Sequence, residues 1–246
     1  MRPKGCAKKP TVLILGSSVA AGSAASPGCS YADLLEAALK ERHGDGYQVL
    51  NAGVGGASVG VTLHYAESVG SAELKPDAVL IALGLANEGL PWAQSVGEGR
   101  KVCERFTEGL RAIAAAVVRR WGRVSILFGG VYPFGLSEGG PGYADWQRRQ
   151  LLAVDAEMRA WEEPVIPFLD FAGSRETCRW HPGVGADMGH PNNLGHLRMF
   201  EAIDLALFPG EASADRDAAP PRSLLARAEV PDVRRLWDYY ALGAIT

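Results

Sequence analysis

The sequence predicts an α/β protein with a mostly parallel sheet of five strands. Short runs rich in Val, Ile and Leu alternate along the chain with longer segments in which apolar residues recur every three or four positions. This alternation is typical of parallel strands joined by helices that bury both faces of the sheet. We expect the strands at Thr11–Leu15, Tyr47–Asn51, Ala78–Leu83, Arg123–Phe128 and Val165–Asp170.

The helices follow in order, and the first has the clearest limits. Ser30 and Asp33 resemble a capping box at its start, Gly44 can end it, and one face carries Leu34, Leu35, Ala38 and Leu39. Apolar residues at helical spacing predict three further helices, at Lys101–Trp121, Tyr143–Trp161 and Leu194–Phe208.

We expect one main domain at residues 11–208, because 246 residues with 47% hydrophobic composition can fill one sizeable core. Residues 1–10 form a short basic arm, and residues 209–222 form a linker rich in Pro and Ala. Residues 223–246 predict a helical extension that docks on the body or on a second copy, which would give a homo-oligomer. Its large apolar residues are Leu236, Trp237, Tyr239 and Tyr240.

Charge and composition exclude several function classes. The net charge is −3 and the basic residues are scattered beyond the amino-terminal arm, which argues against nucleic-acid binding. No apolar run approaches the ~20 residues that span a bilayer, and the first ten residues lack the apolar stretch of a secretory signal. We therefore expect a cytoplasmic protein without a membrane partner. The four cysteines are far apart and predict free thiols.

A nucleophile and a base are predicted from opposite ends of the chain. Ser18 follows the run Thr11–Leu15, so it lies on the turn at the carboxyl end of a first strand, where open α/β sheets bind ligands. Asp187 precedes His190 by three residues, a spacing that lets its carboxylate accept the Nδ1 proton while Nε2 faces outward as a base. We predict that Ser18, His190 and Asp187 form a catalytic triad.

Attack of a serine on a carbonyl also requires donors for the oxyanion that forms. Glycines in Asn51–Ser58, after the second strand, let backbone N–H groups approach a ligand, and we choose Gly56 as one donor. Asn87 follows the third strand and can point its side-chain amide at the same place. Each residue also has a purely structural interpretation: Ser18 and Asp187 as caps, His190 as a capping or packing residue, and Gly56 and Asn87 as turn residues.

No metal or cofactor is expected. The spacings of His181, His190 and His196 near Cys178 match no familiar ligand pattern. The segment Gly53–Ser58 is a near miss for a dinucleotide fingerprint, because Ser58 stands where the third glycine belongs.

Taken together, these segments resemble the four motif blocks of the SGNH hydrolase family, also called GDSL esterases and lipases. The resemblance spans roughly residues 11–208 and follows the family's order, with the blocks at Gly16-Ser17-Ser18, Gly53–Gly56, Asn87-Glu88 and Asp187–Asn192. It implies a flavodoxin-like three-layer α/β/α sandwich, a triad of Ser18, His190 and Asp187, and an oxyanion hole of the Ser18 N–H, the Gly56 N–H and the Asn87 side chain.

The blocks depart from the family pattern at three positions. Ser17 stands where the family usually has Asp, Glu88 replaces another Asp, and Gly84 lies one residue farther from Asn87 than usual. The resemblance implies cleavage of carboxylic esters through an acyl-enzyme. We expect small acyl groups such as acetyl, on a small-molecule or glycoside alcohol.

Two other functions stay open at this stage: an acyltransferase with the same triad, and a catalytically impaired binding protein of the same fold. The residues that bind substrate are not predicted individually. Four aromatic residues could line a pocket or pack under surface loops: Trp92, Tyr132, Phe134 and Trp180.

Overall fold

In the residues that the computed structural model describes, 9–68 and 74–208, five parallel strands form one sheet in the order β2-β1-β3-β4-β5. The strands are β1 (Thr11–Gly16), β2 (Gln48–Gly53), β3 (Ala78–Ala82), β4 (Ser125–Gly129) and β5 (Val165–Ile166). The chain order reverses direction between β1 and β3, and doubly wound sheets bind ligands at such a switch point.

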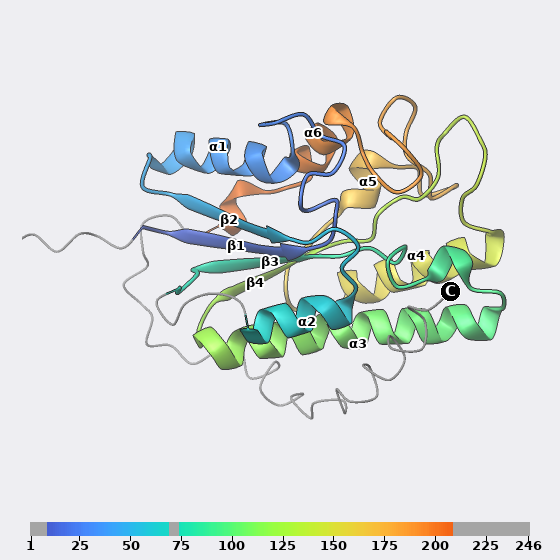
Figure 1. Ribbon diagram of the computed structural model, residues 1–246, viewed down its shortest axis with the longest axis horizontal. Helices are drawn as coiled ribbons and strands as arrows, with labels where there is room; N and C mark the ends of the chain where they lie inside the picture. Colours follow the sequence, from blue (N-terminus) through green and yellow to red (C-terminus); the bar gives the residue numbers. More distant parts are fainter. Residues whose placement is uncertain (1–8, 69–73, 209–246) are drawn as a thin grey trace, which may run out of the picture.

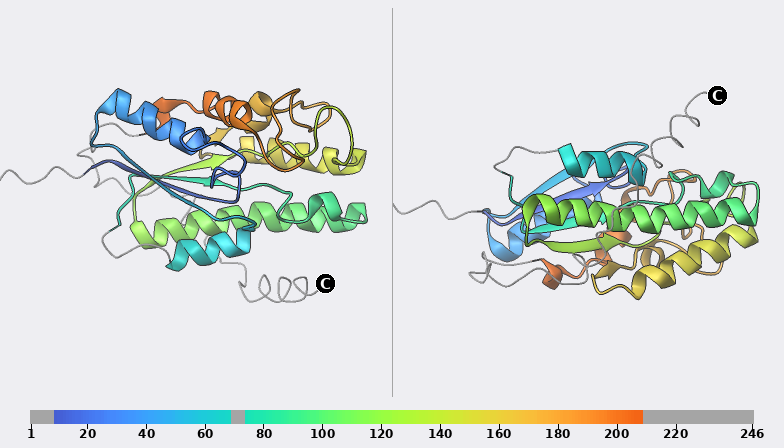
Figure 2. Two further views of the ribbon diagram at one scale, coloured as in Figure 1. Left: turned by 45° about the horizontal axis from the view of Figure 1, so that its top comes forward. Right: turned by 90° about the horizontal axis from the view of Figure 1, so that it is seen from below.

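Helices cover both faces of the sheet, as Figures 1 and 2 show. One face carries α1 (Tyr31–His43), α5 (Phe168–Ala172) and α6 (Asn193–Glu201). The other carries α2 (Val59–Ser68), α3 (Val96–Trp121) and α4 (Asp145–Arg159). The described chain also has short 3₁₀ turns at η1 (Leu90–Trp92) and η2 (Leu205–Leu207). The predicted three-layer α/β/α fold is confirmed.

The side chains of β1 show how the strands join two cores. Leu13 and Leu15 pack in the core beneath α2 and α3, while Val12 and Ile14 pack beneath α1. Because successive side chains of a strand point to opposite faces, a central strand buried on both sides must be apolar at every position. This is why β1 and β3, which are buried at every position, could be found as apolar runs.

Helix α1 begins and ends where the sequence predicts. The Asp33 N–H donates to Ser30 Oγ (3.1 Å), and the Ser30 N–H donates to Asp33 Oδ2 (3.1 Å), which completes the capping box. Gly44 follows the helix with a φ of 86°, in the left-handed region that favours glycine.

The predicted strand Val165–Asp170 is wrong beyond Ile166. β5 pairs with β4 only at Val165 and Ile166, and then Pro167, which has no N–H to donate to a neighbouring strand, leads into α5. Phe168 and Leu169 are buried from this short helix, so their apolar character reflects helix packing and not a strand.

Other helix limits differ from the prediction, and α2 was not predicted. Helix α3 begins at Val96 and not at Lys101, because Ser95 Oγ accepts the Glu98 N–H (3.2 Å) and caps it. Helix α4 is shorter than the predicted Tyr143–Trp161 by two residues at each end. Helix α6 ends at Glu201, and the chain then turns into η2 before Phe208.

The predictions for most of the basic arm, for the 209–222 linker and for the 223–246 extension lie outside the described residues. The homo-oligomer expected from that extension therefore stays a prediction. Among the helices of the described chain, none combines the length and the hydrophobicity that crossing a bilayer requires.

Candidate active site

Ser18 lies in the loop between β1 and α1, at the switch point of the sheet. A Cβ at Gly16 would lie 2.4 Å from the Ala82 carbonyl oxygen and 2.5 Å from the Ala20 Cβ, so only glycine fits where β1 ends. The Ser23 N–H donates to the Ser18 carbonyl (2.9 Å), which winds the chain into a helical turn after the serine. Asn51 Nδ2 donates to the Ala20 carbonyl (2.7 Å) and ties this turn to β2.

His190 and Asp187 lie in the loop that precedes α6. Asp187 Oδ1 accepts the N–H groups of Gly189 (2.7 Å) and His190 (2.9 Å), and these two hydrogen bonds hold the loop in a tight turn. Asn192 caps α6 by accepting the Gly195 N–H (3.1 Å). The histidine is therefore held between a tight turn and a helix start.

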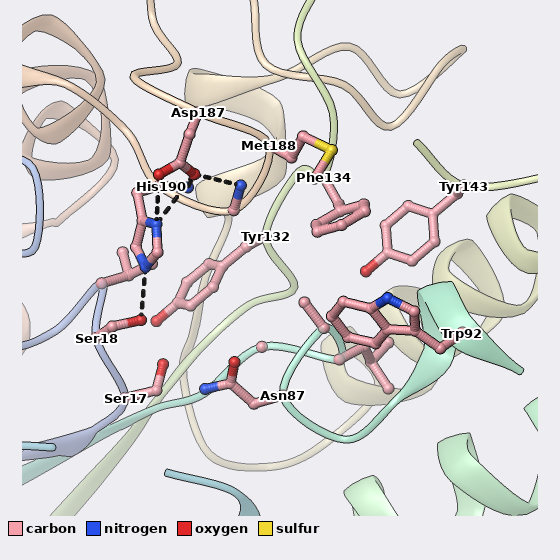
Figure 3. Close-up of a pocket in the computed structure, with 15 residues that line it drawn as sticks. Ser17, Ser18, Asn87, Trp92, Tyr132, Phe134, Tyr143, Asp187, Met188 and His190 are labelled. Atoms are coloured by element: carbon pink, nitrogen blue, oxygen red, sulfur yellow. Dashed lines mark hydrogen bonds and ion pairs between the residues drawn. The ribbon is translucent and has the colours of Figure 1, made fainter. Parts of the chain in front are cut away.

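The structure brings the three predicted triad residues together, although Ser18 and His190 are 172 positions apart. His190 Nδ1 lies 2.9 and 3.0 Å from the two Asp187 carboxylate oxygens, and His190 Nε2 lies 2.9 Å from Ser18 Oγ (Figure 3). With a proton on Nδ1 for the carboxylate, Nε2 accepts the Ser18 hydroxyl proton. This is the arrangement that a general base and its nucleophile need.

The Asp187 carboxylate is stabilised in its charged form. Partial burial raises the pKa of this carboxyl, but hydrogen bonds from the His190 ring and the Gly189 N–H outweigh it, so the pKa lies below its usual range. Asp187 therefore stays negative at neutral pH and can stabilise a positive charge on the imidazole.

Asn87 lines the same cavity from the loop after β3. Its Nδ2 donates one hydrogen to the Ala57 carbonyl (2.9 Å), and an amide nitrogen carries two, so the second remains for a ligand. The neighbouring Glu88, only 6% exposed, accepts the Val59 N–H (2.6 Å) at the start of α2. Asn87 and Glu88 thus fix the loop between β2 and α2 beside the site.

Gly56 is in that β2–α2 loop but is not among the residues that line the cavity. It has a φ of 74°, and an added Cβ would meet no heavy atom within 4 Å, so a tight turn accounts for the glycine. Its role as an oxyanion donor stays a prediction.

The displaced Gly84 makes room for Tyr132. A Cβ at Gly84 would lie 2.7 Å from Cδ2 of the Tyr132 ring, which packs on the glycine and forms part of the cavity wall. Burial raises the pKa of the Tyr132 phenol well above its usual value, so the hydroxyl stays neutral.

The cavity has a volume of about 460 Å³ and two chemically different ends. In Figure 3 the triad, Ser17 and Asn87 lie at one end, and the indole of Trp92 and the rings of Phe134 and Tyr143 lie at the other. Of the aromatic residues singled out in the sequence, Trp92, Tyr132 and Phe134 line this cavity. Trp180 does not, because it is a buried core residue that is 1% exposed.

The cavity is also lined by residues that the sequence did not assign to the site, and Tyr143 and Met188 are among them. Met188 is flanked by the motif residues Asp187 and Gly189, and that position was the only available signal. Tyr143 was interpreted as the start of a helix, and it instead precedes α4.

The described residues contain no group of three or more His, Cys, Asp or Glu side chains that could hold a metal ion. His196 is fully buried, and its Nδ1 faces the Tyr31 N–H (3.3 Å) while Nε2 faces the Ser23 carbonyl (3.3 Å). Both ring nitrogens of this histidine are thus used within the fold.

Comparison with known proteins agrees with this geometry. A model of the GDSL-like lipase/acylhydrolase family matches residues 14–198 of the chain. No curated protein matches the chain.

Among solved structures, TesA has 24% identity and a TM-score of 0.56, with 78% of this chain and 94% of that one covered. A member of the lipolytic protein G-D-S-L family from Veillonella parvula DSM 2008 has 15% identity and a TM-score of 0.53, with 78% and 94% covered. Est24, a carbohydrate acetylesterase from Sinorhizobium meliloti, has 16% identity and a TM-score of 0.54, with 79% and 96% covered. At these identities the likeness shows the fold.

Proposed function

This chain belongs to the GDSL-like lipase/acylhydrolase family and is a carboxylic ester hydrolase, and from its cavity we propose that it cleaves short-chain O-acyl esters, acetyl esters among them, with Ser18 as nucleophile. The observation that carries the proposal is the continuous chain of contacts from Asp187 through His190 to Ser18, with distances of 2.9 to 3.0 Å. We propose a small molecule or a glycoside as the alcohol part.

In the proposed reaction His190 Nε2 takes the hydroxyl proton as Ser18 Oγ forms a bond to the ester carbonyl carbon. The carbonyl oxygen becomes an oxyanion, and Asp187 stabilises the imidazolium. His190 then gives its proton to the alcohol oxygen as the C–O bond breaks, which leaves the acyl group on Ser18. Water, activated by His190, repeats the sequence and releases the acid.

The proposed oxyanion donors are the backbone N–H of Ser18, the backbone N–H of Gly56 and the second amide hydrogen of Asn87. Asn87 has the strongest support, because it lines the cavity and its orientation is fixed by the bond to Ala57. Donors that are already oriented stabilise developing charge without reorganisation.

Solvent access favours water over a second alcohol as the acceptor of the acyl group. The Asp187 side chain is 59% exposed and the His190 side chain is 32% exposed, so the base lies at an open rim. An acyltransferase would instead need to exclude water from this histidine.

The test is a pair of serine variants. Ser18→Ala should lower kcat for p-nitrophenyl butyrate by roughly 10⁴-fold or more, because it removes the attacking oxygen. Ser17→Ala removes the neighbouring hydroxyl, which lines the same cavity, and should keep kcat within about tenfold of wild type. Equal losses in both variants, or a folded Ser18→Ala protein that retains activity, would contradict the proposal.

A further inference from the structure

We infer that the apolar end of the cavity is a subsite for the acyl group, and that the preferred substrates carry an apolar acyl chain of about six to eight carbons, or an aryl ring, in preference to acetyl. The inference rests on the proposed function, because it takes Ser18 as the acylated residue. It keeps the reaction and the nucleophile of the proposed function, and it moves the preferred acyl group from acetyl to longer apolar chains.

Three aromatic side chains build this subsite, which we call the aromatic cup: Trp92, Phe134 and Tyr143. The Trp92 and Phe134 rings meet edge to face with centroids 5.9 Å apart, and Phe134 lies 5.4 Å from Tyr143. They come from η1, from the loop after β4 and from the residues before α4. These three segments are separate in the sequence, so the aromatic cup forms only when the chain is folded.

Large apolar side chains remain exposed at the mouth of the cup. Trp92 is 61% exposed and Met188 is 38% exposed, although both have apolar surface that water disfavours. Both line the cavity, and Figure 3 shows Met188 above Phe134. An apolar ligand in the cup would cover part of this surface.

The position of the base indicates which part of the ester enters the cup. The alcohol must leave from beside His190, and the water that replaces it must reach the same nitrogen. His190 and Asp187 lie at the exposed rim, so this side serves the alcohol and the water. The acyl group stays on Ser18 and points away from His190, and Figure 3 shows the cup on that far side.

The volume of the cavity also suits an acyl group larger than acetyl. At roughly 30 Å³ for each heavy atom, the volume that a water molecule occupies, acetyl fills about 90 Å³ and octanoyl about 270 Å³. The cavity measures about 460 Å³ and must also admit the reacting oxygens. By this measure acetyl would occupy about a fifth of the cavity and octanoyl rather more than half of it, which leaves room for the reacting oxygens.

Each methylene buried in the cup should raise kcat/KM by roughly two- to fourfold, because moving one methylene group from water into an apolar site is favourable by about this factor. We would measure kcat/KM for p-nitrophenyl acetate, butyrate, hexanoate, octanoate and decanoate with the full-length protein. The expected profile rises roughly tenfold or more from acetate to an optimum at hexanoate or octanoate. A profile that is flat or falls beyond acetate would overturn the inference.

Variants test which side chains set the profile. Trp92→Ala and Met188→Ala should each lower kcat/KM for octanoate by roughly tenfold and for acetate by less than about twofold. Phe171→Ala, which truncates an aromatic residue on α5 that is 40% exposed and does not line the cavity, is the matched control and should leave the profile unchanged. An equal effect of Trp92→Ala on both esters would contradict the assignment.

Alkylboronic acids separate the acyl group from the alcohol, because they add to a serine hydroxyl and carry no alcohol part. Hexylboronic acid should inhibit wild type at least about tenfold more tightly than methylboronic acid, and Trp92→Ala should reduce this difference. Equal inhibition by both acids, with normal turnover, would place the alcohol in the cup and overturn the inference alone. Failure of the proposed function would appear differently, as absence of turnover on every ester.

Discussion

Replacing Asn87 by Ala tests the oxyanion hole and separates catalysis from stability. The substitution removes an amide that lines the cavity and donates to the Ala57 carbonyl at 2.9 Å. It leaves the contacts among Ser18, His190 and Asp187 in place, because no hydrogen bond of the triad involves Asn87.

Two effects of different size are expected. Loss of one preorganised oxyanion donor costs about 3 to 4 kcal/mol in the transition state, which lowers kcat by roughly 10²- to 10³-fold. Loss of the bond to Ala57 costs about 1 kcal/mol of folding free energy, or a fall in Tm of roughly 2–4 °C. KM should change little, because the oxyanion exists only in the transition state and the intermediates.

The assay is steady-state hydrolysis of p-nitrophenyl butyrate at a temperature well below the Tm of each variant. Asn193→Ala is the matched control, because Asn193 also forms side-chain hydrogen bonds, with Ser26 (2.7 and 3.1 Å), and does not line the cavity. It should lower the Tm by a similar amount and leave kcat within about twofold. Asn87→Asp is a second test, since a carboxylate beside the oxyanion should lower kcat further.

The reasoning is refuted if Asn87→Ala lowers the Tm as expected and retains wild-type kcat. That result would mean that Asn87 only holds the loop between β2 and α2. A rise in KM with unchanged kcat would instead assign Asn87 to binding of the ground state.

Three further predictions follow from the same contacts. Asp187→Asn should lower kcat by roughly 10³- to 10⁴-fold with only a small loss of Tm, since an amide cannot stabilise the His190 imidazolium but its oxygen can still accept the Gly189 and His190 N–H groups; a loss of kcat below tenfold would argue against the triad. Gly84→Ala places a Cβ 2.7 Å from the Tyr132 ring, so we expect about 1–3 kcal/mol of destabilisation in urea titration and an altered ester preference, whereas wild-type behaviour would contradict this packing. Burial lowers the pKa of His196 below its value in the unfolded chain, so the unfolded chain binds more protons in acid and stability falls as pH drops below about 6.5. For this one histidine the Tm of the wild-type protein should fall by at most about 3–6 °C per pH unit. The Tm of His196→Asn should fall less between pH 7 and 5, and an equal fall in both proteins would refute the role of His196.

The central strands β1 and β3 and the first helix could be predicted because their signals are local. The apolar runs of β1 and β3 reflect burial on both faces, and the limits of α1 are set by Ser30 and Gly44, which are adjacent to it. Helix α2 could not be found in this way. Its first N–H group, at Val59, is capped by Glu88, which lies 29 positions away in the sequence.

The meeting of Ser18, His190 and Asp187 could also be predicted, because the order and spacing of these residues carry most of the information. Asp187 and His190 are in one turn, and the end of β1 fixes where Ser18 emerges. Gly56 shows the limit of the same reasoning. A glycine-rich loop after β2 predicts close backbone approach, but Gly56 is not among the residues that line the cavity, and the contact of this loop with Asn87 is made by the Ala57 carbonyl.

The aromatic cup is the part of the site that the sequence could only suggest. Trp92 and Phe134 were candidates for a pocket, and so was Trp180, which the fold buries in the core behind the site. Tyr143 gave no signal beyond helical spacing. Whether an aromatic side chain lines a cavity depends on which loops pack together, and this is decided by contacts between distant segments.

The most direct test of the central claim is to find the residue that becomes covalently modified. The protein would be incubated with a fluorophosphonate probe, which reacts with an activated serine hydroxyl, and its peptides would be examined by mass spectrometry. The account predicts one adduct on Ser18, formed at a rate that His190→Ala lowers by roughly 10³-fold or more. No adduct, or an adduct on Ser17 in place of Ser18, would contradict it.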